Sequence, residues 1–176
     1  MEYQPRQPGD LVQVDTLDLR PLPNKVLKHF TARDVVSRWD VLEVHERATA
    51  NTATQFLENL QSRAPFPINA IQVDGGSEFQ VEFEQACQDK GINLFLLPPH
   101  SPKLNGHVER AHRTHREEFY EVYAEDLRLG PLNQALQAWE KTYNTVRPHQ
   151  SLDGLTPAEY ISTHFPQLIP KLSHMS

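Results

Sequence analysis

The spacing of apolar residues changes near residue 49, and this change limits the folds open to the chain. Before it, three segments rich in apolar and β-branched residues follow one another, at 11–19, 26–32 and 39–45. Such runs are typical of strands, and three in succession predict an antiparallel meander. After it, apolar residues fall at Ala53, Phe56, Leu57 and Leu60. That spacing is typical of one face of an amphipathic helix.

The rest of the chain alternates short apolar runs with helical patterns. We predict buried strands at 68–73 and 92–97, and helices from about 77 to 91, at 131–144 and after the capping box 156–159. Short apolar strands between helices are typical of a sheet covered on both faces. The expected fold is therefore α/β: a mixed five-stranded sheet, three antiparallel strands first, with helices on both faces.

The length of 176 residues fits a single domain. We expect the core at 10–165, a linker or tail at 1–9 and a C-terminal tail at 166–176. No run of 18 apolar residues and no signal-peptide pattern occurs, so we expect no membrane contact. Cys87 is the single cysteine, which excludes an internal disulfide and a cysteine-rich zinc module. These features predict a cytoplasmic protein.

The charge is unevenly distributed. A net charge of −6 argues against a general nucleic-acid coat protein. Residues 100–116 nevertheless hold four Lys/Arg and one Glu, whereas residues 117–126 hold five acids and no base. This pattern predicts a basic surface beside an acidic one, although a freely solvated mixed-charge helix would have the same composition.

Three acids occupy unusual positions. Asp15 lies within the first strand, Asp74 ends the fourth beside Gly75-Gly76, and Glu109 follows the fifth. An acid in an apolar strand is costly unless it is paired or binds a metal, and open α/β sheets bind ligands at the carboxyl ends of their strands. Converging carboxylates suit Mg²⁺ or Mn²⁺. Two such ions about 4 Å apart can support an in-line phosphoryl displacement.

Each acid taken singly has an ordinary explanation. Asp15 could be a surface acid on an edge strand, Asp74 a turn former and Glu109 a solvated helix residue. Glu78 could be an auxiliary acid, although capping of the following helix is simpler. Bases accompany the third acid: His112, Arg113 and Arg116 follow Glu109 at i+3, i+4 and i+7, on one stripe of a helix. We predict that this stripe, with Lys103 in the preceding loop, binds DNA phosphates.

Four blocks, taken together, resemble the catalytic core of retroviral-type integrases and, more closely, of bacterial insertion-sequence (DDE) transposases. They span about residues 10–162 in the family's order. The blocks are Gln13-Val14-Asp15-Thr16, Val73-Asp74-Gly75-Gly76-Ser77-Glu78-Phe79, Ser101-Pro102-Lys103-Leu104-Asn105-Gly106-His107-Val108-Glu109-Arg110, and Tyr143-Asn144-Thr145-Val146-Arg147-Pro148-His149 with Leu152, Gly154 and Thr156-Pro157.

The resemblance implies a ribonuclease-H-like fold and an enzyme that cleaves DNA at element ends and joins the 3′-hydroxyl to target DNA. It implies that Asp15, Asp74 and Glu109 bind two Mg²⁺ or Mn²⁺ ions. It further implies a homo-oligomer, a dimer or higher, acting on DNA in the bacterial nucleoid. The loop 98–106 corresponds to the family's active-site loop.

The chain also departs from the family's pattern. Thirty-four residues separate Asp74 from Glu109, one fewer than is common, and Gly75 stands where many members have Asn. No zinc-binding domain or helix-turn-helix precedes residue 10. Two rival interpretations therefore stay open: a ribonuclease-H-like nuclease, and a non-catalytic DNA- or protein-binding relic of a transposase.

Overall fold

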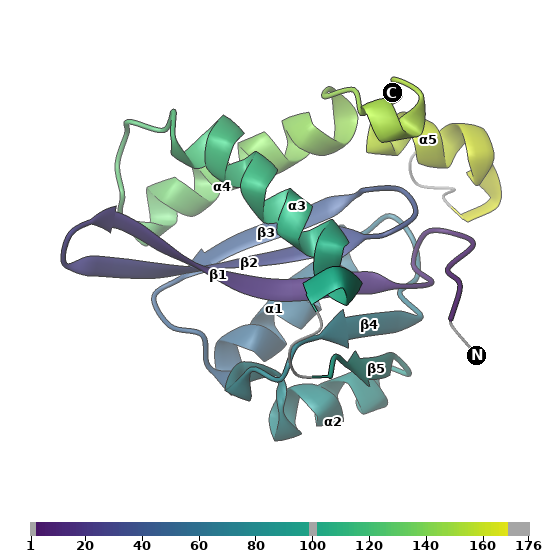
Figure 1. The fold of residues 1–176 in the computed structure, drawn as a ribbon, viewed down its shortest axis with the longest axis horizontal. Coiled ribbons are helices and arrows are strands. Elements are labelled where there is room, and N and C mark those ends of the chain that lie inside the picture. Colours follow the sequence, from purple (N-terminus) through teal and green to yellow (C-terminus); the bar gives the residue numbers. More distant parts are fainter. Residues whose placement is uncertain (1–2, 99–101, 169–176) are drawn as a thin grey trace.

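The computed structural model describes residues 3–98 and 102–168 and contains a five-stranded sheet in the order β3-β2-β1-β4-β5 (Figure 1). The strands are β1 Val12–Leu22, β2 Lys25–Asp34, β3 Asp40–His45, β4 Ala70–Val73 and β5 Asn93–Leu96. β1, β2 and β3 pair antiparallel, whereas β4 pairs parallel to β1 and to β5. The predicted meander and the mixed sheet are both confirmed.

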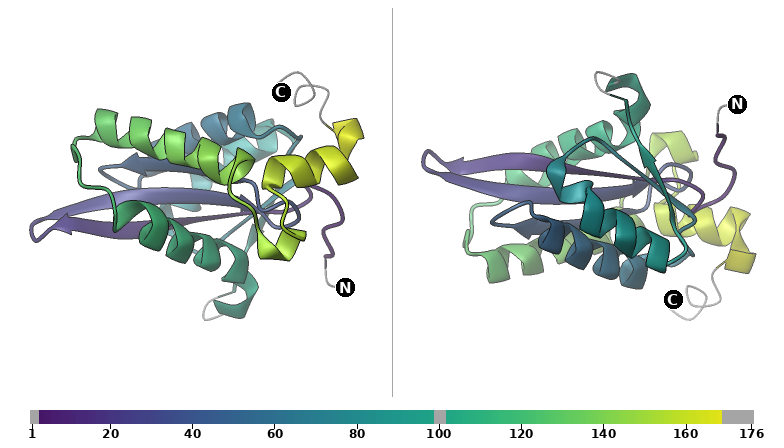
Figure 2. Two further views of the ribbon diagram at one scale, coloured as in Figure 1. Left: turned by 90° about the horizontal axis from the view of Figure 1, so that it is seen from above. Right: turned by 90° about the horizontal axis from the view of Figure 1, so that it is seen from below.

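Helices cover both faces of the sheet, as predicted. They are α1 Ala50–Arg63, α2 Val81–Asp89, α3 Gly106–His115, α4 Leu129–Thr145 and α5 Pro157–His164. α1 and α2 pack on one face and α3 crosses the other, with the sheet between them (Figure 2). The side-chain alternation of the strands explains this arrangement, because Val12 and Val14 join the core under α1 while Leu19 joins a second core near α4.

Two predicted elements differ from the structure. The helix expected from residue 77 is divided into a 3₁₀ turn, Ser77–Phe79, and α2, which begins at Val81. The strand β5 was expected to be buried, but Phe95 is 42% exposed and Leu96 60% exposed. The reason is that β5 is an edge strand paired with β4 alone, so a run of apolar residues did not indicate burial here.

The segment expected as a linker before residue 10 ends inside the packed body. Gly9 is buried, its N–H donates to Asp34 Oδ1 at 2.8 Å, and its carbonyl accepts from Asn69 N–H at 2.7 Å. Gly9 has a φ of +91°, and an added Cβ would lie 1.9 Å from the carbonyl oxygen of Pro67. Only glycine fits this position.

α4 closes the outer edge of β3 with polar side chains. Asn144 accepts from Asp40 N–H at 2.9 Å and donates to Asp40 C=O at 2.8 Å, and Asn133 contacts Val44 N–H and C=O in the same way, at 2.9 Å each. Between them Glu140 accepts from Leu42 N–H at 2.7 Å. The helix thus satisfies backbone groups that an unpaired strand would expose.

In the described part of the chain, no helix is long and apolar enough to cross a membrane.

We expect Asn144→Ala to destabilise the fold by about 3 kcal/mol, because it leaves a buried backbone N–H and C=O unpaired. Urea unfolding followed by circular dichroism measures this. Gln137→Ala, on an exposed turn of the same helix, is the matched control and should change stability by less than about 0.5 kcal/mol. Equal effects of the two substitutions would contradict the role given to the amide.

Candidate active site

Asp15 lies on β1, the central strand of the sheet, on the face that α3 covers. Its Oδ1 accepts from the N–H of Thr16 at 2.9 Å, and its Oδ2 lies 3.5 Å from Nδ2 of Asn105, the residue before α3. Asn105 is buried, and its own Oδ1 has no hydrogen-bond partner in the described structure. Asp15 therefore stands where the central strand meets the start of the helix that carries Glu109.

Asp74 follows the last residue of β4, the parallel neighbour of β1. Its Oδ1 accepts from Gly76 N–H at 2.9 Å, which holds the carboxylate over the turn. A Cβ on Gly76 would lie 2.9 Å from both carboxylate oxygens of Glu78 and 3.0 Å from Asp74 Oδ1, whereas a Cβ on Gly75 would meet nothing. The absence of a side chain at Gly76 thus allows the two carboxylates to approach the turn.

Glu78 faces the acidic site and caps no helix. Its Oε1 accepts from the Thr16 hydroxyl at 3.0 Å, and neither the 3₁₀ turn nor α2 has a side-chain cap. The simpler role expected for Glu78, capping of the second helix, is therefore wrong. The charges of Asp74, after the end of β4, and of Glu78, in the following turn, thus both act on Asp15 in β1.

Burial and neighbouring carboxylates raise the pKa of Asp15 to about 7. Burial is the main cause, and the negative charge of Asp74 adds to it, together with a hydrogen bond that the protonated Asp15 carboxyl donates to Asp74. The charge of Glu78 contributes a smaller part, while the Thr16 N–H opposes the shift. Crowded carboxylates of this kind are typical of a site that a cation neutralises.

Gln13 fixes the start of α3 against the sheet. Its Nε2 donates to Leu104 C=O at 3.0 Å, and its Oε1 accepts from Val108 N–H at 3.0 Å. Gln72 on β4 donates to the same Leu104 carbonyl at 2.7 Å. Because Gln13 and Asp15 share a face of β1, this contact sets the helix beside the acidic site.

An open cavity of about 430 Å³ joins Asp15 to the predicted stripe of α3. Glu109, Arg113 and Arg116 line it, as does His112. Arg113 pairs with Glu117 at 3.0 Å, and Arg116 has no acidic partner in the described part of the structure. The structure thus brings the stripe and the first acid together.

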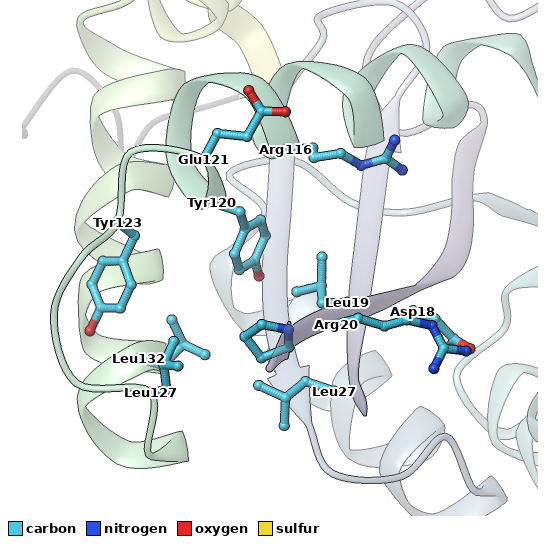
Figure 3. Close-up of a pocket in the computed structure, with 11 residues that line it drawn as sticks. Asp18, Leu19, Arg20, Leu27, Arg116, Tyr120, Glu121, Tyr123, Leu127 and Leu132 are labelled. Atoms are coloured by element: carbon cyan, nitrogen blue, oxygen red, sulfur yellow. The ribbon is translucent and has the colours of Figure 1, made fainter. Parts of the chain in front are cut away.

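Arg116 also lines a neighbouring cavity of about 360 Å³ under the β1–β2 hairpin (Figure 3). The walls there are mixed, with apolar residues such as Leu19, Leu27 and Leu132 below Tyr120. The side chain of Arg116 therefore lies between the acidic site and this hollow.

Glu109 and His112, two of the predicted site residues, lie in opposite environments. Glu109 is exposed, and in the part of the chain that the structure describes no three His, Cys, Asp or Glu side chains lie close enough to hold a metal ion. His112 is only 6% exposed, and burial is the main reason that its pKa falls to about 3. The side chain of Lys103 lies outside the described residues.

A buried polar network holds the C-terminal end of α3. Arg33 forms a double hydrogen bond with Asp40, at 2.8 Å for each contact, and His115 Nε2 lies 2.7 Å from Asp40 Oδ2. Trp139 donates to His115 Nδ1 at 2.8 Å, so His115 carries its proton on Nε2 and donates to Asp40. Burial favours the neutral carboxyl, but Arg33 and His115 outweigh it and hold the pKa of Asp40 at about 2.

Sequence reasoning had found the acids but not the residues that position them. Gln13 belonged to a recognised block, yet an amide within an apolar strand gave no sign of its partner 91 residues away. Thr16 and Asn105 also belonged to such blocks and Gln72 to none, but none of the three was predicted to position an acid, because each is an ordinary polar residue that only the fold brings to the site.

Structures of retroviral integrases have the same fold. A chain in the intasome of simian T-cell lymphotropic virus, solved in complex with PP2A regulatory subunit B56 gamma, superposes with a TM-score of 0.81 and 22% identity, covering 96% of this chain and 60% of that one. The catalytic core domain of BIV integrase gives 0.70 and 23%, covering 90% and 98%. The HTLV-2 integrase catalytic core in complex with magnesium, a dimeric form, gives 0.69 and 19%, covering 88% and 97%. The predicted ribonuclease-H-like fold is confirmed.

Proteins of bacterial insertion elements are similar to this chain in sequence. The chain is 28% identical over 96 residues to a 31.7 kDa protein of insertion element IS407 from Burkholderia multivorans, and 27% identical over 96 residues to a 39.2 kDa protein of IS476 from Xanthomonas euvesicatoria. Each match covers 54% of this chain but only 34% and 28% of those proteins, so the chain aligns with about a third of their length.

Family models give the assignment. Two models, both described as integrase core domain, match residues 5–102 and 90–157, and the first alone spans more than half of the chain. The matches together contain Asp15, Asp74 and Glu109. The chain belongs to the integrase core domain family.

Proposed function

We propose that the chain catalyses divalent-metal-dependent cleavage and strand transfer of DNA in the transposition of a bacterial insertion element. The observation that carries this proposal is the meeting of Asp15, within β1, with Asp74, which follows the end of the parallel neighbour β4, beside a cavity lined by Glu109 and Arg116. Acids alone would repel DNA. Arginines across the same cavity supply the attraction that a phosphodiester needs.

The donor set fits a hard divalent cation. Asp15, Asp74 and Glu109 offer only carboxylate oxygens, and the raised pKa of Asp15 reflects negative charge that Mg²⁺ or Mn²⁺ would neutralise. Two such ions would activate the attacking oxygen and stabilise the leaving oxygen. In this proposal the exposed side chain of Glu109 completes the ligand set after Asp15 and Asp74 have bound.

The chain's other residues bind and orient DNA. Arg116, exposed and without an acidic partner in the described structure, contacts a backbone phosphate. Arg113 does so after leaving Glu117, while His112 supports the helix from inside. Lys103 would add a contact from the loop before α3. Asn105 and the Thr16 N–H keep the Asp15 carboxylate in one orientation.

We also propose how the chain assembles and where it acts. Joining two element ends to one target requires two active sites, so we propose a dimer or higher oligomer of this chain. The related HTLV-2 core is described in dimeric and trimeric forms. Because the curated relatives come from bacterial insertion elements, the substrate is DNA in the nucleoid.

Asp74→Asn should reduce strand-transfer and disintegration activity on branched DNA with Mn²⁺ at least about 100-fold, because it removes a charged metal ligand. Gel separation of labelled products measures the rate. Glu82→Gln, an exposed acid on α2, is the matched control and should leave the rate unchanged. An Asp74→Asn variant as active as the wild type would refute the proposed triad, and an inactive wild type that still binds DNA would favour a relic.

Asp15→Asn should stabilise the protein, and more so as pH rises. The pKa of Asp15 is about 7 in the folded state and about 3.9 unfolded, so the folded state binds more protons between these values and wild-type stability falls through this window. The variant avoids that loss. Its advantage should be near zero at pH 4 and about 2 kcal/mol at pH 8, a value reduced for the partial exposure of Asp15.

Thermal unfolding at the two pH values measures the difference, with Glu82→Gln as control. Mn²⁺ at pH 8 should raise the Tm of the wild type and raise that of Asp15→Asn less. A gain that is independent of pH would show that charge repulsion at Asp15 is not its cause.

Arg116→Gln should weaken DNA binding about tenfold and reduce the slope of log K against log salt by about 0.9, the value for one phosphate contact. Fluorescence anisotropy over a salt series measures both. Arg47→Gln, an exposed arginine between β3 and α1, is the control and should change neither. Glu117→Gln should strengthen binding because it frees Arg113. Identical slopes for Arg116→Gln and the wild type would exclude the stripe as the DNA surface.

A further inference from the structure

A second basic cavity lies along another side of α3, formed by residues other than those that face Asp15. It measures about 280 Å³ and is lined from α3 by His107, Arg110 and Thr114, at i, i+3 and i+7. None of these three lines the cavity at Asp15. The remaining walls come from β2, the β2–β3 turn, and the end of α4 with the segment that follows it, so the cavity is a separate feature of the fold.

Four guanidinium groups line this cavity, and two of them are neutralised within the protein. Arg33 pairs with the buried Asp40 at 2.8 Å, and Arg147 forms two contacts with Glu118, at 3.0 and 2.7 Å. Arg38 and Arg110 have no carboxylate within 4 Å in the described part of the chain. The cavity therefore carries about two uncompensated positive charges.

This excess charge is costly where it stands. Arg38 is half-buried, and burial followed by the charges of Arg33 and Arg110 lowers its pKa. Burial and the same three arginines also lower the pKa of His107 to about 4. Nearby positive charges that disfavour one another are relieved by an anion.

Polar groups without partners line the same cavity. His149 is 7% exposed, and its buried Nε2 has no hydrogen-bond partner in the described structure. The side chains of Thr114, Gln150 and Ser151 line the cavity and take part in no hydrogen bond that the described residues form. A buried polar atom rarely stays unpaired, so Nε2 of His149 indicates a missing partner. Thr114 is half-buried and Gln150 and Ser151 are exposed, so their side chains are free to bind a ligand.

We propose that this cavity binds a phosphate group between Arg38 and Arg110. Guanidinium groups match the oxygens of phosphate in charge and geometry, and the hydroxyls of Thr114 and Ser151 can donate to the remaining oxygens. The volume suits a group of this size better than a drug-sized ligand. Resting on the proposed function, we assign the group to the backbone of bound DNA, and free phosphate is the other source of the same chemistry.

The position of Arg38 accords with this assignment. Its backbone has a φ of +63°, in the left-handed region that favours glycine or asparagine, and its Nη1 donates to Val35 C=O at 2.6 Å. A purely structural role in the turn would explain this backbone conformation and this hydrogen bond. It would not explain why Arg110, which forms no such contact, lines the same cavity.

Binding of inorganic phosphate is the first test. Phosphate at millimolar concentration should raise the Tm of the wild type and of Arg47→Gln equally, and should raise that of Arg110→Gln much less. Arg110 is exposed, so its variant is expected to fold. Arg38→Gln should also lose the response. A shift of equal size in all four proteins, or in none, would overturn the proposal.

The DNA salt series is the second test, and it distinguishes one phosphate held by two arginines from two independent charges. Arg110→Gln and Arg38→Gln should each reduce the slope by about 0.9, and the double variant should lose no more than either single one. Additive losses would overturn the shared site. A phosphate response with unchanged DNA slopes would support the cavity and assign it to free phosphate. Asp74 takes no part in the phosphate cavity. The activity of Asp74→Asn therefore tests the proposed function independently of phosphate binding in this cavity.

Discussion

The side-chain amide of Gln13 is the contact on which the site depends. It ties both the carbonyl of Leu104 and the N–H of Val108 to the central strand, two residues from Asp15. An amide is suited to this because it donates and accepts at once, and burial makes both bonds expensive to lose. The start of α3 is therefore fixed to the strand that carries the first acid. The bases along α3 are placed by the same contact.

Much of the fold could be predicted because the sheet has two differently covered faces. Successive side chains of a strand point to opposite faces, and β1 accordingly places Val12 and Val14 in the core under α1, and Gln13 and Asp15 toward α3. It was harder to predict which strands lie at the edges of the sheet, because an apolar run such as β5 has the same composition in a central strand and in an edge strand. The break before α2 was also missed: it follows from the turn that aims Glu78 at Thr16, which no periodicity encodes.

The site was predictable only in its acids. Asp15 and Asp74 were conspicuous because a carboxylate is out of place in or beside an apolar strand, and the structure brings them together. Glu109 shares a cavity with Asp15 but forms no three-residue cluster with both acids in the described chain. Residues that act through a partner 60 to 95 positions away carry no local signal, which is why Gln13 and Thr16 were not identified. The second arginine cavity was missed for the same reason, since its walls come from four separate segments.

The closure of β3 by α4 has a consequence for how the chain is made. Asn133, Glu140 and Asn144 lie 89, 98 and 104 residues after their partners on the strand. During synthesis the meander therefore leaves the ribosome well before the helix that shields it, and β3 presents a row of open hydrogen-bonding groups for that interval. Premature termination before residue 129 would leave this edge permanently exposed. Nascent and truncated chains are thus the forms in which the β3 edge is open to sheet-to-sheet aggregation.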